Sequence, residues 1–100
     1  MADYTNKKVI VRCNRAGVYF GTLKEYDHNT REATLTDCRN IWYWDGAASI
    51  HQLATDGVTR PDNCKFTVVV PEMSVMEVIE TIPCTDKAIK CIEEVSVWKR

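Results

Sequence analysis

The stretch that decides the fold is KVIVRCNRAGVYFGTLKEYDHNTREATLTDC, residues 8–38. Three segments within it are rich in β-branched residues or alternate between apolar and polar side chains, as strands do: residues 8–13, 18–26 and 31–38. Between them, residues 14–17 and 27–30 supply the Asn, Asp and Gly that turns favour. The stretch therefore predicts an antiparallel meander of three strands.

Two short helices are predicted downstream of the meander. The first covers residues 47–54, where Ser49 and Gln52 are spaced as a capping box. Gly57 is placed to close this helix in a left-handed conformation. The second helix follows Thr85, which is expected to be its N-cap. Its apolar side chains fall on one face and are Ala88, Ile89 and Ile92.

Further strands are predicted on both sides of the second helix. A strand over residues 65–70 is expected to end at Pro71. Residues 75–82 fit both a helical stripe and a strand, and their β-branched content favours a strand. The alternating tail, residues 95–98, is expected to pair as the last strand. Together these elements predict an α+β fold, an antiparallel sheet or small β-barrel with two short helices.

Length and composition predict a single folded domain over residues 1–100. Hydrophobic residues make up 45% of the chain and charged residues 27%, the balance of an ordinary globular protein. Apolar runs such as residues 68–70 are far shorter than the roughly 20 residues that a membrane-spanning helix needs. Because the N-terminal residues 1–8 also lack an apolar signal core, we expect an intracellular protein without a membrane segment.

Charge is distributed unevenly, although the formal net charge is only −1. Residues 1–24 carry a net charge of +4, because five cationic side chains stand against Asp3 alone. The cationic residues are Lys7, Lys8, Arg12, Arg15 and Lys24. Such an end could contact phosphate or an acidic partner, or could simply form a solvated sheet face. A pI near 6.1 and the lack of a recognisable nucleic-acid-binding motif argue against binding to duplex nucleic acid.

The cysteines predict reduced thiols, because their number is odd and no Cys-x-x-Cys pair occurs. They are Cys13, Cys38, Cys64, Cys84 and Cys91. Cys84 precedes the second predicted helix, whose N-terminal dipole could lower the pKa of the thiol. The sequence contains no complete catalytic motif and no metal-ligand spacing. We therefore expect a protein that is not an enzyme and that needs neither a metal nor a cofactor.

A binding site is expected in the segment RNIWYWDGAAS, residues 39–49. Alternation along a strand would place Trp42 and Trp44 on one face and Arg39 on the other. One set of aromatic side chains could build the core while the other lines a pocket or a subunit interface. Exposed indoles near the cation of Arg39 could also stack on a flat base. Ser49, at the helix start, could offer its hydroxyl to an anion or could serve only as a cap.

Four blocks of the sequence resemble small, mostly uncharacterised proteins encoded in tailed phages and prophages of bacteria. They are AGVYFG at 16–21, the segment 39–54, PDNCKF at 61–66 and PCT at 83–85. The most distinctive part is the pattern Arg-x-x-Trp-Tyr-Trp-x-Gly-Ala-Ala-Ser at 39–49. Asn40 stands where the family pattern commonly has a second arginine. The resemblance implies an accessory protein of a phage, located in the cytoplasm of the bacterial host.

By analogy with small phage proteins of this class, we expect an inhibitor of host defence. It would capture a nucleotide-type immune signal within a homo-oligomer, without turnover. The expected ligand-binding residues are Trp42 and Trp44 for the base, Arg12, Arg15 and Arg39 for phosphate, and Ser49 at the helix start. The alternative is a protein-interaction module in which the same aromatic block docks on a host defence protein or another host or phage protein.

Overall fold

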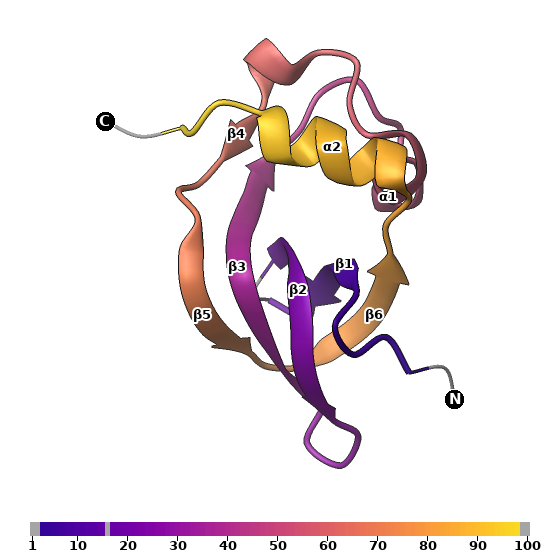
Figure 1. Cartoon of the computed structure of the whole chain (residues 1–100), viewed down its shortest axis with the longest axis vertical. Coiled ribbons are helices and arrows are strands. Elements are labelled where there is room, and N and C mark those ends of the chain that lie inside the picture. The colour runs from indigo at the N-terminus through magenta and orange to yellow at the C-terminus, as the bar shows by residue number, and fades with distance from the viewer. Residues whose placement is uncertain (1–2, 16, 99–100) are drawn as a thin grey trace.

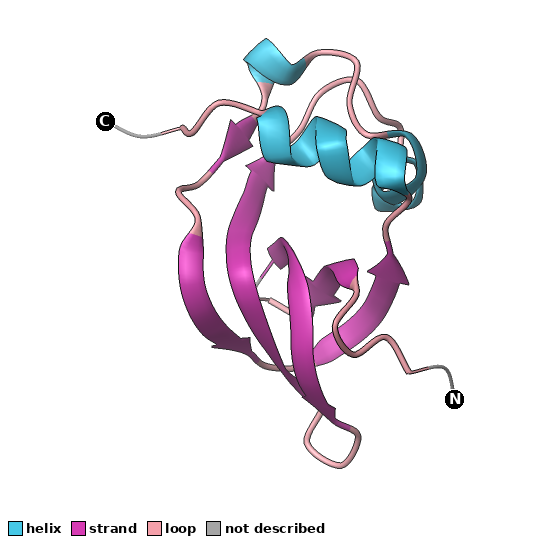
Figure 2. Cartoon of the chain, viewed as in Figure 1, coloured by secondary structure: helices cyan, strands magenta, loops and turns pink. Residues whose placement is uncertain are grey.

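The structure, a computed structural model, describes residues 3–15 and 17–98. In chain order its elements are β1 (Lys8–Cys13), β2 (Gly17–Asp27), β3 (Glu32–Tyr43), α1 (Ile50–Asp56), the 3-10 helix η1 (Pro61–Asn63), β4 (Lys65–Phe66), β5 (Val70–Val75), β6 (Val78–Pro83) and α2 (Asp86–Glu94). The two α-helices lie against each other at one end of the strands (Figures 1 and 2). The predicted α+β class, with an antiparallel sheet and two short helices, is confirmed.

The predicted meander forms the centre of the sheet. Its strands pair in the order β4-β3-β2-β1-β6, and β5 pairs with the first part of β3, all antiparallel. The third strand is longer than predicted, because it continues to Tyr43 and pairs there with β4. Figure 1 shows the strands in a strongly curved arc, with β5 and β6 joined at its lower end. The sheet is therefore open and curved, not a closed barrel.

Pro71 does not end a strand, so that prediction is wrong. It lies inside β5, between Val70, which pairs with Cys38, and Glu72, which pairs with Thr36. A proline fits an edge strand where its missing N–H would point away from the ladder. The strand predicted over residues 65–70 is accordingly split into β4 and the start of β5.

The segment 75–82 contains a strand, as predicted, but its first residue belongs to β5 and β6 begins only at Val78. The tail is less regular than expected. It makes a single parallel bridge between Phe66 and Val97, supported by a 2.8 Å hydrogen bond from the Trp98 N–H to the Phe66 carbonyl. A regular last strand over residues 95–98 is thus absent from the described structure.

Side chains cap both α-helices where the sequence predicted. The Ser49 hydroxyl accepts the Gln52 N–H at 3.2 Å, but the Gln52 side chain accepts the N–H of Ala48 instead of that of Ser49. The helix therefore starts at Ile50, three residues later than predicted. Gly57 follows α1 with φ of 78°, and a Cβ there would lie 2.6 Å from that of Cys91. Glycine is required both by this conformation and by the close approach of α2.

The core has one cluster on each face of the sheet. Phe20, Leu53 and Ile92 belong to the cluster between the sheet and the helices. A second cluster, which includes Val9 and Leu35, fills the other face. Successive residues of β1 are buried in different clusters, because alternate side chains of a strand point to opposite faces. This explains why the β1 sequence is almost continuously apolar.

Arg39 is buried, with 3% of its surface exposed, and it ties β3 to the end of α2. Its guanidinium donates to the carbonyls of Ile92 and Val95, both at 3.0 Å, at the C-terminal end of the helix. It also donates to the carbonyl of Thr67 at 2.9 Å and to that of Phe66 at 3.3 Å. Because helix C-termini carry partial negative charge, these acceptors compensate the buried cation.

We predict that Arg39→Lys lowers the free energy of unfolding by about 2–4 kcal/mol, since an ammonium cannot reach four carbonyls in the planar geometry of a guanidinium. Urea unfolding followed by tryptophan fluorescence measures this loss. The matched control is Arg31→Lys, at an exposed position, for which we expect a change below about 0.5 kcal/mol. Equal losses in the two variants would contradict a structural role for the four hydrogen bonds.

Candidate functional site

The six residues expected to bind a ligand are not brought together. Arg39 contributes its guanidinium to the core, where each nitrogen is already bonded to main-chain carbonyls. Burial lowers the pKa of this group, but an arginine remains charged at any physiological pH. The expectation that Arg39 meets a phosphate is therefore wrong, because the side chain is buried and four of its N–H groups already donate to main-chain carbonyls.

Arg12 is exposed on β1, and Arg15 is exposed just after the end of that strand. The Nε atom of Arg12 is 3.3 Å from a carboxylate oxygen of Glu80 on β6. The second oxygen of Glu80 is 2.9 Å from Nε2 of His51 on α1. Arg15 occupies the turn between β1 and β2 with φ of 70°. Neither arginine is placed beside Trp42 or Ser49 by any described contact.

Trp44 and Ser49 have structural partners. The Trp44 side chain is half-buried against the cluster beneath the helices, and its Nε1 donates to the Ala47 carbonyl at 3.2 Å. Ser49 uses its hydroxyl as the cap of α1. The expected common face of Trp42 and Trp44 is wrong, because β3 ends at Tyr43 and its alternation stops there.

Trp42 remains exposed, with 60% of its surface accessible, and it stacks on Trp98 from the tail. The two ring centroids are 5.1 Å apart and the ring planes differ by 21°. The ammonium of Lys65 lies 5.4 Å from the Trp42 ring centroid and 5.5 Å from that of Trp98. A cation at such distances is attracted by the ring faces and helps to hold both indoles in place.

Other exposed apolar residues lie in the segments that carry this stack. We define the tryptophan patch by three segments that meet around Phe66, and its members are Trp42, Lys65, Val68, Val69, Val97 and Trp98. Phe66 pairs with Ile41 on one side and with Val97 on the other, while the Thr67 N–H donates to the Asn40 carbonyl at 3.1 Å. Clustered exposed apolar side chains usually mark an interaction surface.

Sequence reasoning found Trp42 but missed Lys65 and Trp98. Both residues are distant from the aromatic block along the chain and reach it only through the pairing around Phe66. The alternation of residues 95–98 was the available signal, since it predicted that the tail would pair with the sheet. It did not indicate which strand the tail would meet.

All five cysteines are unpaired in the structure. The pKa of the Cys84 thiol is not lowered by its place before α2. Burial instead raises this pKa from an ordinary value of 9.0 to about 12. The group is therefore a neutral thiol at physiological pH and a poor nucleophile. Within residues 3–15 and 17–98, no three His, Cys, Asp or Glu side chains form a group that could hold a metal ion.

We predict that Cys84 makes stability fall at alkaline pH. The folded state holds the thiol proton up to a pKa of about 12, whereas the unfolded chain releases it near 9.0, so unfolding is favoured as pH rises above 9.0. Between pH 8 and pH 10, the native protein should lose roughly 1 kcal/mol more of its unfolding free energy than Cys84→Ala does. Urea unfolding of both proteins at the two pH values measures the difference. Identical losses would show that Cys84 has the same pKa in both states.

None of the described helices is long and apolar enough to cross a membrane. No curated protein matches the chain. Residues 6–92 match a family described as a domain of unknown function (DUF6948). This match spans most of the chain, including the meander, the aromatic block and nearly all of α2. The chain therefore belongs to the DUF6948 family, a domain of unknown function.

Proposed function

We propose that this protein is a non-catalytic binding module that docks on another protein through the tryptophan patch. The observation that carries this proposal is the exposed Trp42, stacked on Trp98 and flanked by Lys65. Tryptophan contributes more binding energy per residue at protein interfaces than most other side chains. The patch is thus a suitable anchor for a partner.

The composition of the patch favours a protein over a nucleotide. The same segments expose the aliphatic side chains of Val68, Val69 and Val97, which suit an apolar partner surface and offer nothing to a phosphate. The arginines expected to hold phosphate lie elsewhere, and Arg39 is buried. Capture of a nucleotide would therefore have to rely on base stacking and on Lys65.

The stack also lowers the entropic cost of docking. Both indoles are already held face to face, and Lys65 restrains them further, so few rotamers are lost when a partner covers them. The free outer surface of Trp42 can fill an apolar pocket, while the nearby ammonium favours a carboxylate at the rim of that pocket. We therefore propose a partner with an apolar pocket edged by acidic residues.

We also propose the biological setting in which this docking takes place. The resemblance to phage and prophage proteins suggests that the partner is a host or phage protein in the bacterial cytoplasm. Inhibition of a host defence protein would be one outcome of such docking. A homo-oligomer would form if the patch of a second copy served as the partner. A measurement of subunit number distinguishes such an oligomer from a complex with a different protein.

We predict that Trp42→Ala abolishes partner binding without unfolding the protein, because the side chain is exposed. Native mass spectrometry of the tagged protein, purified from its bacterial host with and without an added nucleotide panel, measures bound mass and subunit number together. Tyr43→Ala is the matched control, since Tyr43 is a neighbouring exposed aromatic residue outside the stack. A partner protein retained by the native chain and by Tyr43→Ala, but lost from Trp42→Ala, is the expected result.

Two outcomes would contradict this proposal. A nucleotide adduct that depends on Trp42, with no protein bound, would return the function to nucleotide capture. An oligomer of this chain alone that dissociates in Trp42→Ala would assign the patch to self-association. Circular dichroism of the variants verifies that the fold is intact in each case.

A further inference from the structure

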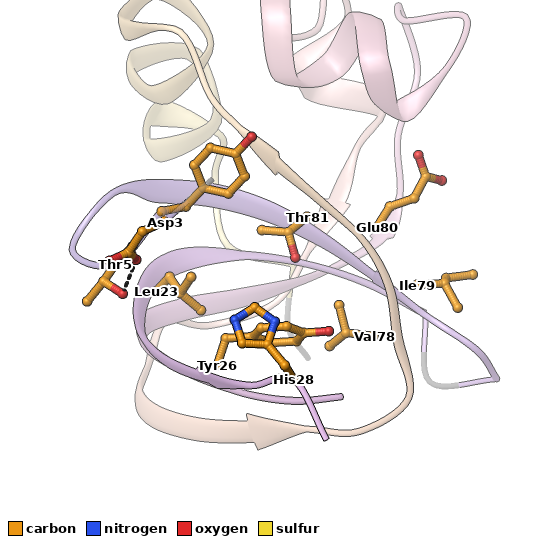
Figure 3. Close-up of a pocket in the computed structure, with 10 residues that line it drawn as sticks. Asp3, Thr5, Leu23, Tyr26, His28, Val78, Ile79, Glu80 and Thr81 are labelled. Atoms are coloured by element: carbon orange, nitrogen blue, oxygen red, sulfur yellow. Dashed lines mark hydrogen bonds between the residues drawn. The ribbon is translucent and has the colours of Figure 1, made fainter. Parts of the chain in front are cut away.

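A cleft of about 480 Å³ lies between the N-terminal segment, the end of β2 and β6. None of the six residues that the sequence suggested as ligand-binding lines it. Figure 3 shows Asp3 on one side of the cleft and Glu80 on the other, with Tyr26 and His28 between them. Its volume lies within the range of small-ligand sites, roughly 300–1,000 Å³. The cleft can therefore take a small molecule or one side chain of a partner.

Main-chain hydrogen bonds hold the walls of the cleft in place. The Asn6 N–H donates to the Leu23 carbonyl at 2.7 Å, and the Leu23 N–H donates to the Lys7 carbonyl at 3.0 Å. These bonds fix the N-terminal segment beside β2. The Val78 N–H donates to the Arg31 carbonyl at 3.0 Å, which fixes the start of β6 beside the turn after β2. The walls are thus positioned before a ligand enters.

Asp3 offers an ionised carboxylate with one oxygen that accepts no hydrogen bond from the described residues. Its Oδ1 accepts the Thr5 N–H at 2.9 Å and the Thr5 hydroxyl at 2.5 Å. No described residue donates to Oδ2 within hydrogen-bond distance. The bonds from Thr5 hold the pKa of Asp3 below its usual value, so the group carries a negative charge at physiological pH. Its free oxygen can accept a donor from a ligand.

Aromatic rings supply the second element of the cleft. Tyr4 and Tyr26 line it, and Tyr26 packs edge to face against His28 with ring centroids 4.8 Å apart. Lys7 already places its ammonium 6.0 Å from the centroid of the Tyr4 ring, so this ring attracts a cation within the protein itself. Tyrosine faces together with a carboxylate form a suitable environment for an organic cation.

The charges of the lining residues also favour a cationic ligand. The described residues that line the cleft include Asp3 and Glu80 but neither lysine nor arginine. Glu80 is partly compensated by Arg12 and His51. Lys7 and His28 also interact electrostatically with Asp3, although its hydrogen bonds come from Thr5. An anion such as a nucleotide phosphate would find neither lysine nor arginine among these lining residues. A ligand with positive charge is favoured on electrostatic grounds.

We propose that this cleft binds a guanidinium cation, which stacks on a tyrosine face and donates a hydrogen bond to Oδ2 of Asp3. A guanidinium fits better than an ammonium, because it is planar, stacks on aromatic rings and is less strongly hydrated. The hydroxyl of Thr81, which also lines the cleft, is a further acceptor for its donors. The ligand could be a free guanidino compound or an arginine side chain of a protein, since both present the same group. The proposal does not depend on docking through the tryptophan patch.

The test titrates the full chain with agmatine, with N-acetyl-Gly-Arg-Gly-amide and with the neutral citrulline analogue of that peptide. Amide chemical shifts of the lining residues report binding. We expect saturable shifts with one or both guanidinium ligands and none with the citrulline peptide. Tighter binding of agmatine would indicate a free compound, and tighter binding of the arginine peptide would indicate a protein side chain; either result supports the proposal.

Two variants test the chemistry of the cleft. Asp3→Asn should weaken guanidinium binding by about 5–10-fold, because it removes the charge but keeps the shape of the side chain. Asp62→Asn, at an exposed acidic position on η1, is the matched control and should bind as the native protein does. Tyr4→Phe should retain binding, whereas Tyr4→Leu should weaken it several-fold, because only the phenylalanine keeps an aromatic face.

Several outcomes would overturn the proposal. Equal binding of the arginine and citrulline peptides would remove the role of the positive charge. Equal affinity of the native protein and Asp3→Asn would remove the role of the carboxylate, and no binding of either guanidinium ligand at millimolar concentration would leave the cleft without this ligand. Guanidinium binding by Trp42→Ala should match that of the native protein, so failure of the docking proposal can be distinguished from failure of this one.

Discussion

The buried guanidinium of Arg39 is the interaction on which the arrangement of the helix end, the sheet and the tail depends. A charged side chain enters a protein core only if acceptors replace its lost hydration. Here the acceptors are main-chain carbonyls at the end of α2 and in and after β4, and the C-terminal end of the helix adds a favourable dipole. One side chain from β3 therefore fixes three segments that are far apart in the sequence.

The same contacts create the exposed surface that we propose for docking. Phe66 receives a hydrogen bond from Arg39 through its carbonyl, and its ring centroid lies 5.4 Å from the guanidinium carbon. Phe66 also pairs with Val97, and this pairing brings Trp98 to the ring of Trp42. The buried face of β3 thus holds the segments in place, while its exposed face carries the indole stack. The stability of the fold and the proposed docking surface therefore both depend on β4.

The two proposed sites differ in chemistry and in position. The tryptophan patch is apolar with one ammonium, and it belongs to the end of β3, to β4 and to the tail. The cleft is aromatic and negatively charged, and it belongs to the N-terminal segment, the end of β2 and β6. Figure 1 shows β4 on one side of the molecule and β6 on the other, and these two strands are the ends of the strand order. The sites could therefore be occupied independently, with an apolar and acidic partner at one and a cation at the other.

The sequence by itself determined the local elements: the meander and both helix caps depend on patterns within a few residues. It could not place Pro71 inside a strand, because only pairing with β3 shows that this position lies on an edge. The tertiary structure alone decided the site. Arg39 and Trp42 are neighbours on one strand, yet the end of α2 covers the first and the tail leaves the second exposed. Their roles depend on contacts with residues 56 positions away, such as the bond from Arg39 to Val95, and no local pattern specifies which segment covers a strand face.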